Sequence, residues 1–195
     1  MELVVATGNR KKLKEIQIIL SGELFHIRCL ADFPKIPEPA EDGKTFAENA
    51  VSKAKYYAQK LDRTVLAEDS GLEVKALDGK PGVYSARFAG PEKRDADNIA
   101  AVLNLMKKVP VPKRQASFTS AACLATPKGE TFLFKGRKNG SIALKPKGKN
   151  GFGYDPIFFL PELKKTFAEL SPRQKNTLSH RRIALGKVRD FLKSF

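Results

Sequence analysis

Short apolar runs alternate with amphipathic helical segments over the first third of the chain, and this order constrains the fold more than any other feature. Glu2–Ala6 is an apolar run of the length found in a buried strand. It leads through the turn Thr7–Asn9 into Arg10–Leu20, where apolar residues recur at helical spacing. A second helical stripe over Phe46–Leu61 is followed by a second apolar run, Thr64–Ala67. Strands and helices that interleave in this way are typical of a mixed α/β fold.

Strands cluster in the middle of the chain. Gln115–Thr126 and Glu130–Lys135 are predicted to be two strands joined by the turn Pro127–Gly129, which makes a hairpin. A helix is expected over Asp95–Lys108, and Ser171–Pro172 starts another helical segment. The chain ends in a predicted helix whose apolar residues are Ile183, Leu185, Val188 and Leu192. A length of 195 residues, with no internal repeat and no obvious linker, suits one domain or two tightly joined lobes.

The chain is strongly basic, with 36 Lys and Arg residues against 21 Asp and Glu residues and a net charge of +15. Such an excess favours polyanionic partners, either nucleic acid or small phosphorylated substrates, although a general use of surface lysines also produces it. The segment 135–149 holds six basic residues and no acid, whereas carboxylates gather at 38–42 and at 68–73. A cation-binding centre in a basic surround fits a metal–polyphosphate substrate better than bare nucleic acid.

The sequence favours a cytoplasmic protein that does not enter a membrane. No apolar run approaches the roughly 18 residues that a membrane span needs. The opening Met1–Ala6 lacks the longer apolar core and cleavage site of a signal peptide. Cys29 and Cys123 are too few for a disulfide scaffold and are expected to be free, buried thiols.

The stretch Thr7–Lys12, between a strand and a helix, is a candidate phosphate-binding loop. A helix N-terminus offers unpaired N–H groups and partial positive charge, Gly8 allows close approach of the backbone, and Lys11 and Lys12 add full charges. The plainer interpretation is an ordinary helix capped by Asn9. The stretch is not a Walker A loop, because the match that ends at residues 43–45 lacks its earlier glycine.

A run of acidic and small residues, Glu68–Gly71, is predicted to lie at the end of the strand Thr64–Ala67. Ligands of α/β sheets gather at strand ends, and paired carboxylates there suit magnesium binding or general-base work. The simpler alternative is a solvated acidic turn. Glu41 and Asp42, just before the second helix, could supply a further oxygen ligand or form an ordinary acidic loop.

Two later stretches offer groups for binding a nucleotide base. Small residues surround the aromatic residues in Gly151–Pro156, so that a flat base could stack there, and a tight turn with packed aromatics explains the pattern equally well. Lys175, His180 and Arg181 are further polar candidates. With two histidines in the chain, a histidine-rich zinc site is not expected.

Seven motifs occur in one order along almost the whole chain. They are TGN followed by lysines at 7–12, TFAENA at 45–50, EDSGL at 68–72, PGVYSARFAG at 81–90, GFGYDPIF at 151–158, KTFAEL at 165–170 and K-N-x-x-SHR at 175–181. Each is weak alone, but the ordered set resembles the inosine triphosphate pyrophosphatase family, also called non-canonical purine NTP pyrophosphatases.

This resemblance implies a single domain over residues 1–195 with an elongated mixed β-sheet, flanking helices and two lobes around a central cleft. It implies an enzyme that hydrolyses ITP, dITP and XTP to the monophosphate and pyrophosphate and so cleanses the nucleotide pool. It also implies Mg²⁺ as cofactor and a homodimer. We expect no stable complex with nucleic acid, since no pattern of a known nucleic-acid-binding module is present.

The resemblance also assigns the site residues. Metal binding falls to Glu41 and Asp69, with Asp69 as the catalytic proton acceptor. The expected substrate-binding residues are Thr7, Gly8, Asn9, Arg10, Lys11, Lys12, Lys53, Ser70, Phe152, Gly153, Tyr154, Asp155, Lys175, His180 and Arg181. Many bacterial members have aspartate where this chain has Glu68, and glutamate where it has Ala40, so the metal ligand set is open and Glu38 and Glu68 remain candidates.

In this scheme Lys12 and Lys53 stabilise the leaving pyrophosphate. Phe152 and Tyr154 flank the purine, while His180 and Arg181 bind its polar edge. Two alternatives remain open. One is a Maf-like nucleotide pyrophosphatase with other substrates, including pyrimidine nucleotides, and the other is a nucleic-acid-binding protein without enzymatic activity.

Overall fold

The computed structural model describes residues 2–22 and 26–194. Contacts between residues group the chain into two compact units. Unit 1 comprises Met1–Asp69, Ser120–Gly136 and Arg181–Phe195. Unit 2 comprises Ser70–Thr119 and Arg137–His180.

The described residues form a seven-stranded mixed sheet in the order β2-β1-β3-β4-β5-β6-β7. The strands are β1 (Glu2–Ala6), β2 (His26–Cys29), β3 (Val65–Val74), β4 (Gln115–Ala125), β5 (Thr131–Ile142), β6 (Phe158–Leu160) and β7 (Lys165–Thr166). β1 runs parallel to both β2 and β3, whereas β6 runs antiparallel to β5 and β7. The predicted mixed sheet with flanking helices is thereby confirmed.

The α-helices are α1 (Arg10–Leu20), α2 (Phe46–Leu61), α3 (Asp95–Leu105), α4 (Pro172–Leu178) and α5 (His180–Leu192). Short 3₁₀ helices lie at Leu30–Asp32, Lys75–Leu77, Gly82–Arg87, Val111–Lys113 and Phe167–Glu169. Within the described ranges, no helix combines the length and apolar character that crossing a membrane requires.

Side-chain caps set where three of the helices begin. The Asn9 side chain accepts hydrogen bonds from the backbone N–H groups of Lys11 and Lys12, and Thr45 accepts one from the N–H of Glu48. Ser171 and Gln174 form a full capping box at the start of α4. Each cap accepts hydrogen bonds from N–H groups that the first turn of a helix cannot pair internally. The capping residues therefore indicate in the sequence where these helices begin.

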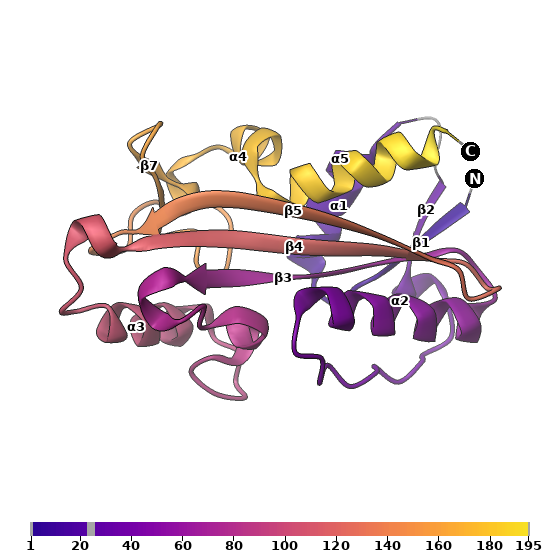
Figure 1. Ribbon diagram of the computed structural model, residues 1–195. Coiled ribbons are helices and arrows are strands. Elements are labelled where there is room, and N and C mark those ends of the chain that lie inside the picture. Colours follow the sequence, from indigo (N-terminus) through magenta and orange to yellow (C-terminus); the bar gives the residue numbers. More distant parts are fainter. Residues whose placement is uncertain (1, 23–25, 195) are drawn as a thin grey trace. The chain divides into compact units, whose positions relative to one another are not determined.

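Helices cover both faces of the strands in unit 1. Figure 1 shows α1 and α5 on one side of β1 and α2 on the other. On the first side, Leu3 and Val5 of β1 pack with Ile16 and Ile19 of α1 and with Leu185 of α5. The alternate strand residues point the other way, as the two-residue period of a strand requires.

Unit 2 also has helices on both sides of its strands, with α3 on one side of β4 and α4 on the other (Figure 1). Its core contains Val102 and Met106 with the aromatic residues Phe118, Phe158 and Phe167, all buried. The Phe118 and Phe167 rings stack with centroids 5.8 Å apart. These aromatic contacts form part of the buried core of unit 2.

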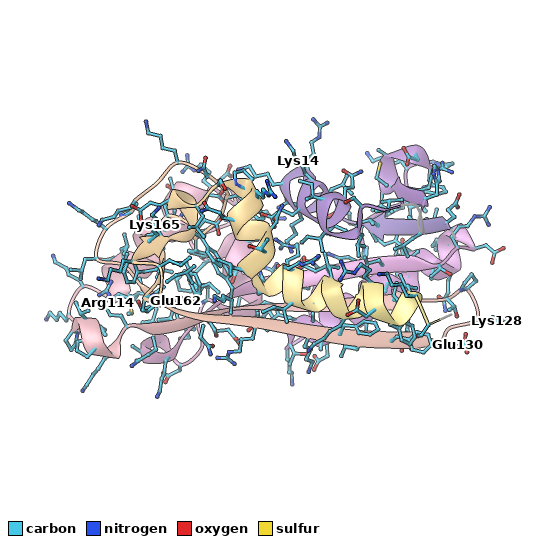
Figure 2. The ribbon with its side chains drawn as sticks, turned by 90° about the horizontal axis from the view of Figure 1, so that it is seen from above. Lys14, Arg114, Lys128, Glu130, Glu162 and Lys165 are labelled. Carbon is cyan, nitrogen blue, oxygen red and sulfur yellow. The ribbon has the colours of Figure 1, made fainter. Side chains whose placement is uncertain are left out.

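The hairpin between β4 and β5 was predicted correctly. The N–H of Gly129 donates to the carbonyl oxygen of Thr126 across the turn, and Gly129 has a φ of 90° that favours glycine. Figure 2 shows Lys128 and Glu130 at this turn. Among the two cysteines, Cys123 is buried, Cys29 is partly exposed, and burial raises the pKa of the Cys123 thiol to about 11.

Several sequence predictions were wrong in detail. Glu68–Gly71 does not end a strand, because β3 continues through it. β5 extends to Ile142, beyond the predicted end at Lys135, since its alternating exposed polar residues hide the strand. α3 ends at Leu105, three residues before the predicted end at Lys108. Ile183, one of the apolar residues of the predicted last helix, is 38% exposed. The short strands β2, β6 and β7 were not predicted.

Candidate active site

The predicted phosphate loop lies in unit 1 between β1 and α1. Thr7–Asn9 turns the chain, and the N–H of Asn9 donates to the Thr7 hydroxyl at 3.2 Å. The side chain of Glu38 lies against Gly8, since a Cβ added at Gly8 would come within 2.8 Å of the Glu38 carboxylate. Glycine therefore gives this loop the room in which a carboxylate approaches its backbone.

Glu68 is the centre of a buried polar network in unit 1. Its side chain is fully buried, and its Oε2 lies 3.1 Å from the Nζ of Lys12. The Ser120 hydroxyl donates to Oε1 at 2.7 Å, and the Arg181 guanidinium donates to the same oxygen at 3.2 Å. A charge in this position is tolerated because hydrogen-bonded cations compensate it.

Arg181 was predicted to bind the purine edge, and the structure places its guanidinium among carboxylates. Its side chain is 1% exposed and forms ion pairs with both Glu15 and Glu68. Glu15 reaches it from α1, so the guanidinium links α1 and the first turn of α5 to β3. The role of Arg181 toward a base stays a prediction, and its bonds to these two carboxylates are what the structure describes.

Asp69 follows Glu68 on β3 and points into a second polar group of unit 1. The Asn49 side-chain amide donates to its Oδ2 at 2.9 Å. Burial raises the pKa of the Asp69 carboxyl, the charge of Lys12 and the Asn49 hydrogen bond oppose that rise, and the charges of Glu68 and Glu41 add to it. Two further carboxylates therefore act electrostatically on Asp69 in this part of unit 1.

The remaining predicted ligands of unit 1 form an ion pair. The Nζ of Lys53, on α2, bonds to Oε1 of Glu41 in the loop before that helix. Both side chains are partly exposed. A cation thus lies beside a carboxylate here too, as in the Lys12–Glu68 pair.

These oxygen donors fit a hard divalent cation. Among the residues that the structure describes, no group of three or more His, Cys, Asp or Glu side chains is arranged to hold a metal ion. Magnesium usually takes one or two carboxylates and fills its other positions with water and substrate phosphates. Asp69 and Glu41 are suited to that role, because the Glu41 charge disfavours ionisation of Asp69 and a divalent cation would offset this repulsion.

The predicted aromatic loop lies in unit 2. Gly151 and Gly153 both have positive φ values, 78° and 58°. The N–H of Phe152 donates to the Asp155 carboxylate at 2.8 Å, and the Nζ of Lys175 bonds to the same oxygen. The Lys175 Nζ also lies 4.6 Å from the centroid of the Phe152 ring. The loop is thus closed around a buried ion pair, with one ring face against a cation.

Tyr154 and His180 are buried in unit 2. The Tyr154 side chain lies in the core, 3% exposed, and its hydroxyl donates to the carbonyl oxygen of Ser85 at 2.8 Å. The His180 ring is 3% exposed and stacks on Phe118 with centroids 4.7 Å apart. Of the two aromatic residues predicted to flank a purine, Phe152 is the partly exposed one.

The predicted residues are divided between the two units. The set in unit 1 contains Thr7–Lys12, Glu41, Lys53, Asp69 and Arg181, and the set in unit 2 contains Phe152–Asp155, Lys175 and His180. Ser70 follows Asp69 on β3.

Sequence reasoning missed Glu15, Asn49 and Ser120 as partners of these sets, and it missed Asp95, whose carboxylate accepts a hydrogen bond from the N–H of Gly153. Glu15 and Asn49 lie within or beside recognised motifs. Ser120 follows Thr119 in β4 and precedes the apolar run 121–125, so its residue type gave no signal of a buried partner for Glu68.

Comparisons with known proteins show which family the chain belongs to. The sequence model of the Ham1 family matches residues 3–191. The chain belongs to the Ham1 family. A relative from Geobacillus kaustophilus, named dITP/XTP pyrophosphatase, is 48% identical over 187 residues, covering 96% of this chain and 92% of the relative. One from Exiguobacterium sp. with the same name is 50% identical over 188 residues, covering 96% and 95%.

The fold agrees with a solved Ham1 protein as well. The structure of a HAM1 protein from Coxiella burnetii matches with a TM-score of 0.92 at 38% identity, covering 100% of both chains. The resemblance to the inosine triphosphate pyrophosphatase family is confirmed by these matches to the Ham1 family and to relatives named dITP/XTP pyrophosphatase.

Proposed function

We propose that this Ham1 protein is a nucleoside triphosphate pyrophosphatase that hydrolyses ITP, dITP and XTP to the monophosphate and pyrophosphate. The observation that carries this proposal is the set of lysines and carboxylates gathered beside the capped start of α1. Lysines and a helix N-terminus suit a polyphosphate, and Asp69 and Glu41 suit its cation. The relatives' name, dITP/XTP pyrophosphatase, supports this activity with dITP and XTP as substrates.

In the proposed reaction a water attacks the α-phosphorus in line and pyrophosphate leaves. Asp69 orients that water and accepts its proton, a role suited to a carboxyl whose pKa is raised by burial. Lys12 and Lys53 stabilise the leaving pyrophosphate with their positive charges. Magnesium bound by Glu41 and Asp69 would supply charge neutralisation of the phosphates.

Carboxylates hold both lysines in place before a substrate binds. In the structure, Lys12 pairs with Glu68 and Lys53 pairs with Glu41. These ion pairs hold the ammonium groups in place, so little side-chain entropy is lost when a phosphate joins them. Lys12, Ser120 and Arg181 all bond to Glu68. These bonds favour a role for Glu68 in positioning the two basic side chains over a role as a metal ligand.

In unit 2 we assign the contact with the base to Phe152, with Lys175 held beside its ring. His180 and Arg181 are proposed to favour bases with a carbonyl oxygen at ring position 6. An arginine can only donate hydrogen bonds, so it suits the oxygen of hypoxanthine and xanthine and opposes the amino group of adenine.

A panel of triphosphates tests the proposal. ITP, dITP, XTP, ATP, GTP, CTP and UTP would be incubated with the protein and Mg²⁺, and pyrophosphate and orthophosphate measured separately. We expect pyrophosphate with equal amounts of monophosphate, and kcat/KM for ITP and XTP well above that for ATP and GTP. Orthophosphate with a nucleoside diphosphate would contradict the reaction, and preferential turnover of pyrimidine nucleotides would favour the Maf-like alternative.

We further propose that the protein acts as a homodimer in the cytoplasm, on a small nucleotide and without a stable nucleic-acid complex. Light scattering coupled to gel filtration measures whether the protein is a dimer. A mobility-shift assay with RNA and DNA measures nucleic-acid binding, and it is run at physiological salt because electrostatic binding weakens steeply with salt.

A further inference from the structure

The aromatic loop of unit 2 is held by two carboxylates, and only one of them belongs to the loop. The N–H of Phe152 donates to Asp155 at 2.8 Å. The next N–H, that of Gly153, donates to Oδ2 of Asp95 at 2.8 Å, 58 residues away in the chain. Asp95 is the first residue of α3. Two successive backbone N–H groups thus donate to carboxylates, one within the loop and one on α3.

The hydrogen bond to Asp95 matters because its donor, Gly153, is a glycine in a left-handed conformation. Its φ is 58°, and a Cβ added there would meet nothing within 4 Å. Glycine moves between conformations at little cost, and no neighbouring atom crowds the position where a Cβ would lie. The hydrogen bond to Asp95 therefore adds to the turn hydrogen bond from the N–H of Asp155 to the carbonyl oxygen of Phe152, and together they select one conformation for the residue next to Phe152.

The same turn of α3 also binds the backbone of residues 86–89. Asn98 accepts a hydrogen bond from the N–H of Ala89 at 2.8 Å and donates to the carbonyl oxygen of Ala86 at 3.1 Å. Tyr154 reaches the neighbouring carbonyl, that of Ser85. Burial, with a contribution from the Asp95 charge, raises the pKa of Tyr154, so the hydroxyl keeps its proton and donates.

We propose that Asp95 is a positioning residue for the base-binding loop, fixing Gly153 and through it the orientation of the Phe152 ring. Asp95 does not touch the substrate in this scheme. It acts on how well the base binds, and leaves the phosphate-binding residues of unit 1 unaffected. The inference rests on the proposed function for its effect on the substrate, but the hydrogen bond itself can be tested without any substrate.

The first test is residue-resolved hydrogen exchange by NMR in the protein without substrate. Asp95→Ala removes the acceptor, and we expect the Gly153 amide to exchange roughly tenfold faster or more, because it no longer donates to a charged group. Asp95→Asn retains an acceptor oxygen and should restore most of the protection. Asp97→Ala is the matched control, because Asp97 lies in the same turn and pairs with exposed Arg94.

The second test is steady-state kinetics with ITP, together with calorimetric binding of inosine monophosphate and of inorganic pyrophosphate. Asp95→Ala should raise KM for ITP roughly tenfold with kcat changed less than about threefold, and weaken the monophosphate by a similar factor. The affinity for pyrophosphate should stay the same, and Asp95→Asn should recover most of the loss.

The outcomes separate the inference from the proposed function. Unchanged Gly153 exchange in Asp95→Ala overturns the inference, as does faster exchange with an unchanged affinity for inosine monophosphate. Equal weakening of monophosphate and pyrophosphate also overturns it, since that result means a general loss of structure. A wild-type protein that hydrolyses none of the triphosphates contradicts the proposed function, and the exchange and binding measurements still decide the inference.

Discussion

Replacement of Arg181 by methionine should cost the protein a large part of its stability. The Arg181 side chain is 1% exposed and pairs with Glu15, 13% exposed, and with fully buried Glu68. Methionine fills similar volume but leaves two carboxylates without that cation. Removing one partner of a buried ion pair costs about 3–5 kcal/mol, because the remaining charge stays out of water. Lys12 and Ser120 still bond to Glu68, which favours the lower half of that range.

Thermal and urea unfolding followed by circular dichroism measure this loss. For a chain of this size, about 3–5 kcal/mol corresponds to a fall in melting temperature of roughly 6–20 °C. Arg173→Met is the matched control, since Arg173 is exposed on α4, and it should change stability by less than about 0.5 kcal/mol. A loss below about 1 kcal/mol in Arg181→Met would refute the reasoning that Arg181 compensates buried carboxylates.

The same variant tests the base-reading role under conditions where it is folded. If Arg181 also donates to position 6 of the base, turnover of ITP should fall much more than turnover of ATP. The kcat/KM for ITP divided by that for ATP should then decrease. A large loss of stability with an unchanged ratio would assign Arg181 to the carboxylate network alone. The base-reading role would then fall to His180 or to backbone N–H groups near Phe152.

The remaining predictions concern both units. Asp69→Asn should lower kcat for ITP by roughly a hundredfold or more while circular dichroism shows an intact fold, and near-normal turnover at saturating Mg²⁺ would rule out its catalytic role. Lys12→Ala should weaken triphosphate binding and turnover with little effect on monophosphate affinity measured by calorimetry, and equal losses for both ligands would remove it from the leaving-group site. Gly71→Ala should destabilise the protein by about 1–3 kcal/mol in urea unfolding, because its Cβ would lie 2.2 Å from the Ser85 hydroxyl; an unchanged midpoint would show that the 82–87 segment can move away.

Local structure was the part of the fold that the sequence predicted best. α1 begins where Asn9 caps it, and α4 begins where Ser171 and Gln174 cap each other. These signals lie within four residues of the helix start, so they do not depend on the rest of the chain. The apolar stripe of α2 was predicted for the same reason.

β3 shows where local reasoning fails. Acidic and small residues in a row predict a turn, because a buried carboxylate in a strand is costly when nothing compensates it. Here Ser120 lies 52 residues and Arg181 113 residues further along the chain, and both bond to Glu68. Their proximity follows from tertiary packing, which a single sequence does not display. The short strand β7 escaped prediction because two residues carry no period.

The candidate site divides in the same way. Motifs identified Asp69, Lys12 and the aromatic loop by residue type and order. They did not indicate that the Arg181 guanidinium is occupied by carboxylates, or that Asp95 holds Gly153. Both facts depend on contacts between residues far apart in the sequence.

The most direct test of the central claim is the position of oxygen from water after hydrolysis of ITP. The reaction would be run with Mg²⁺ in water enriched in ¹⁸O, and the inosine monophosphate and pyrophosphate analysed by mass spectrometry. Attack on the α-phosphorus predicts one ¹⁸O atom in the monophosphate and none in the pyrophosphate. Label in the pyrophosphate, or label in orthophosphate with inosine diphosphate as the other product, would contradict the account.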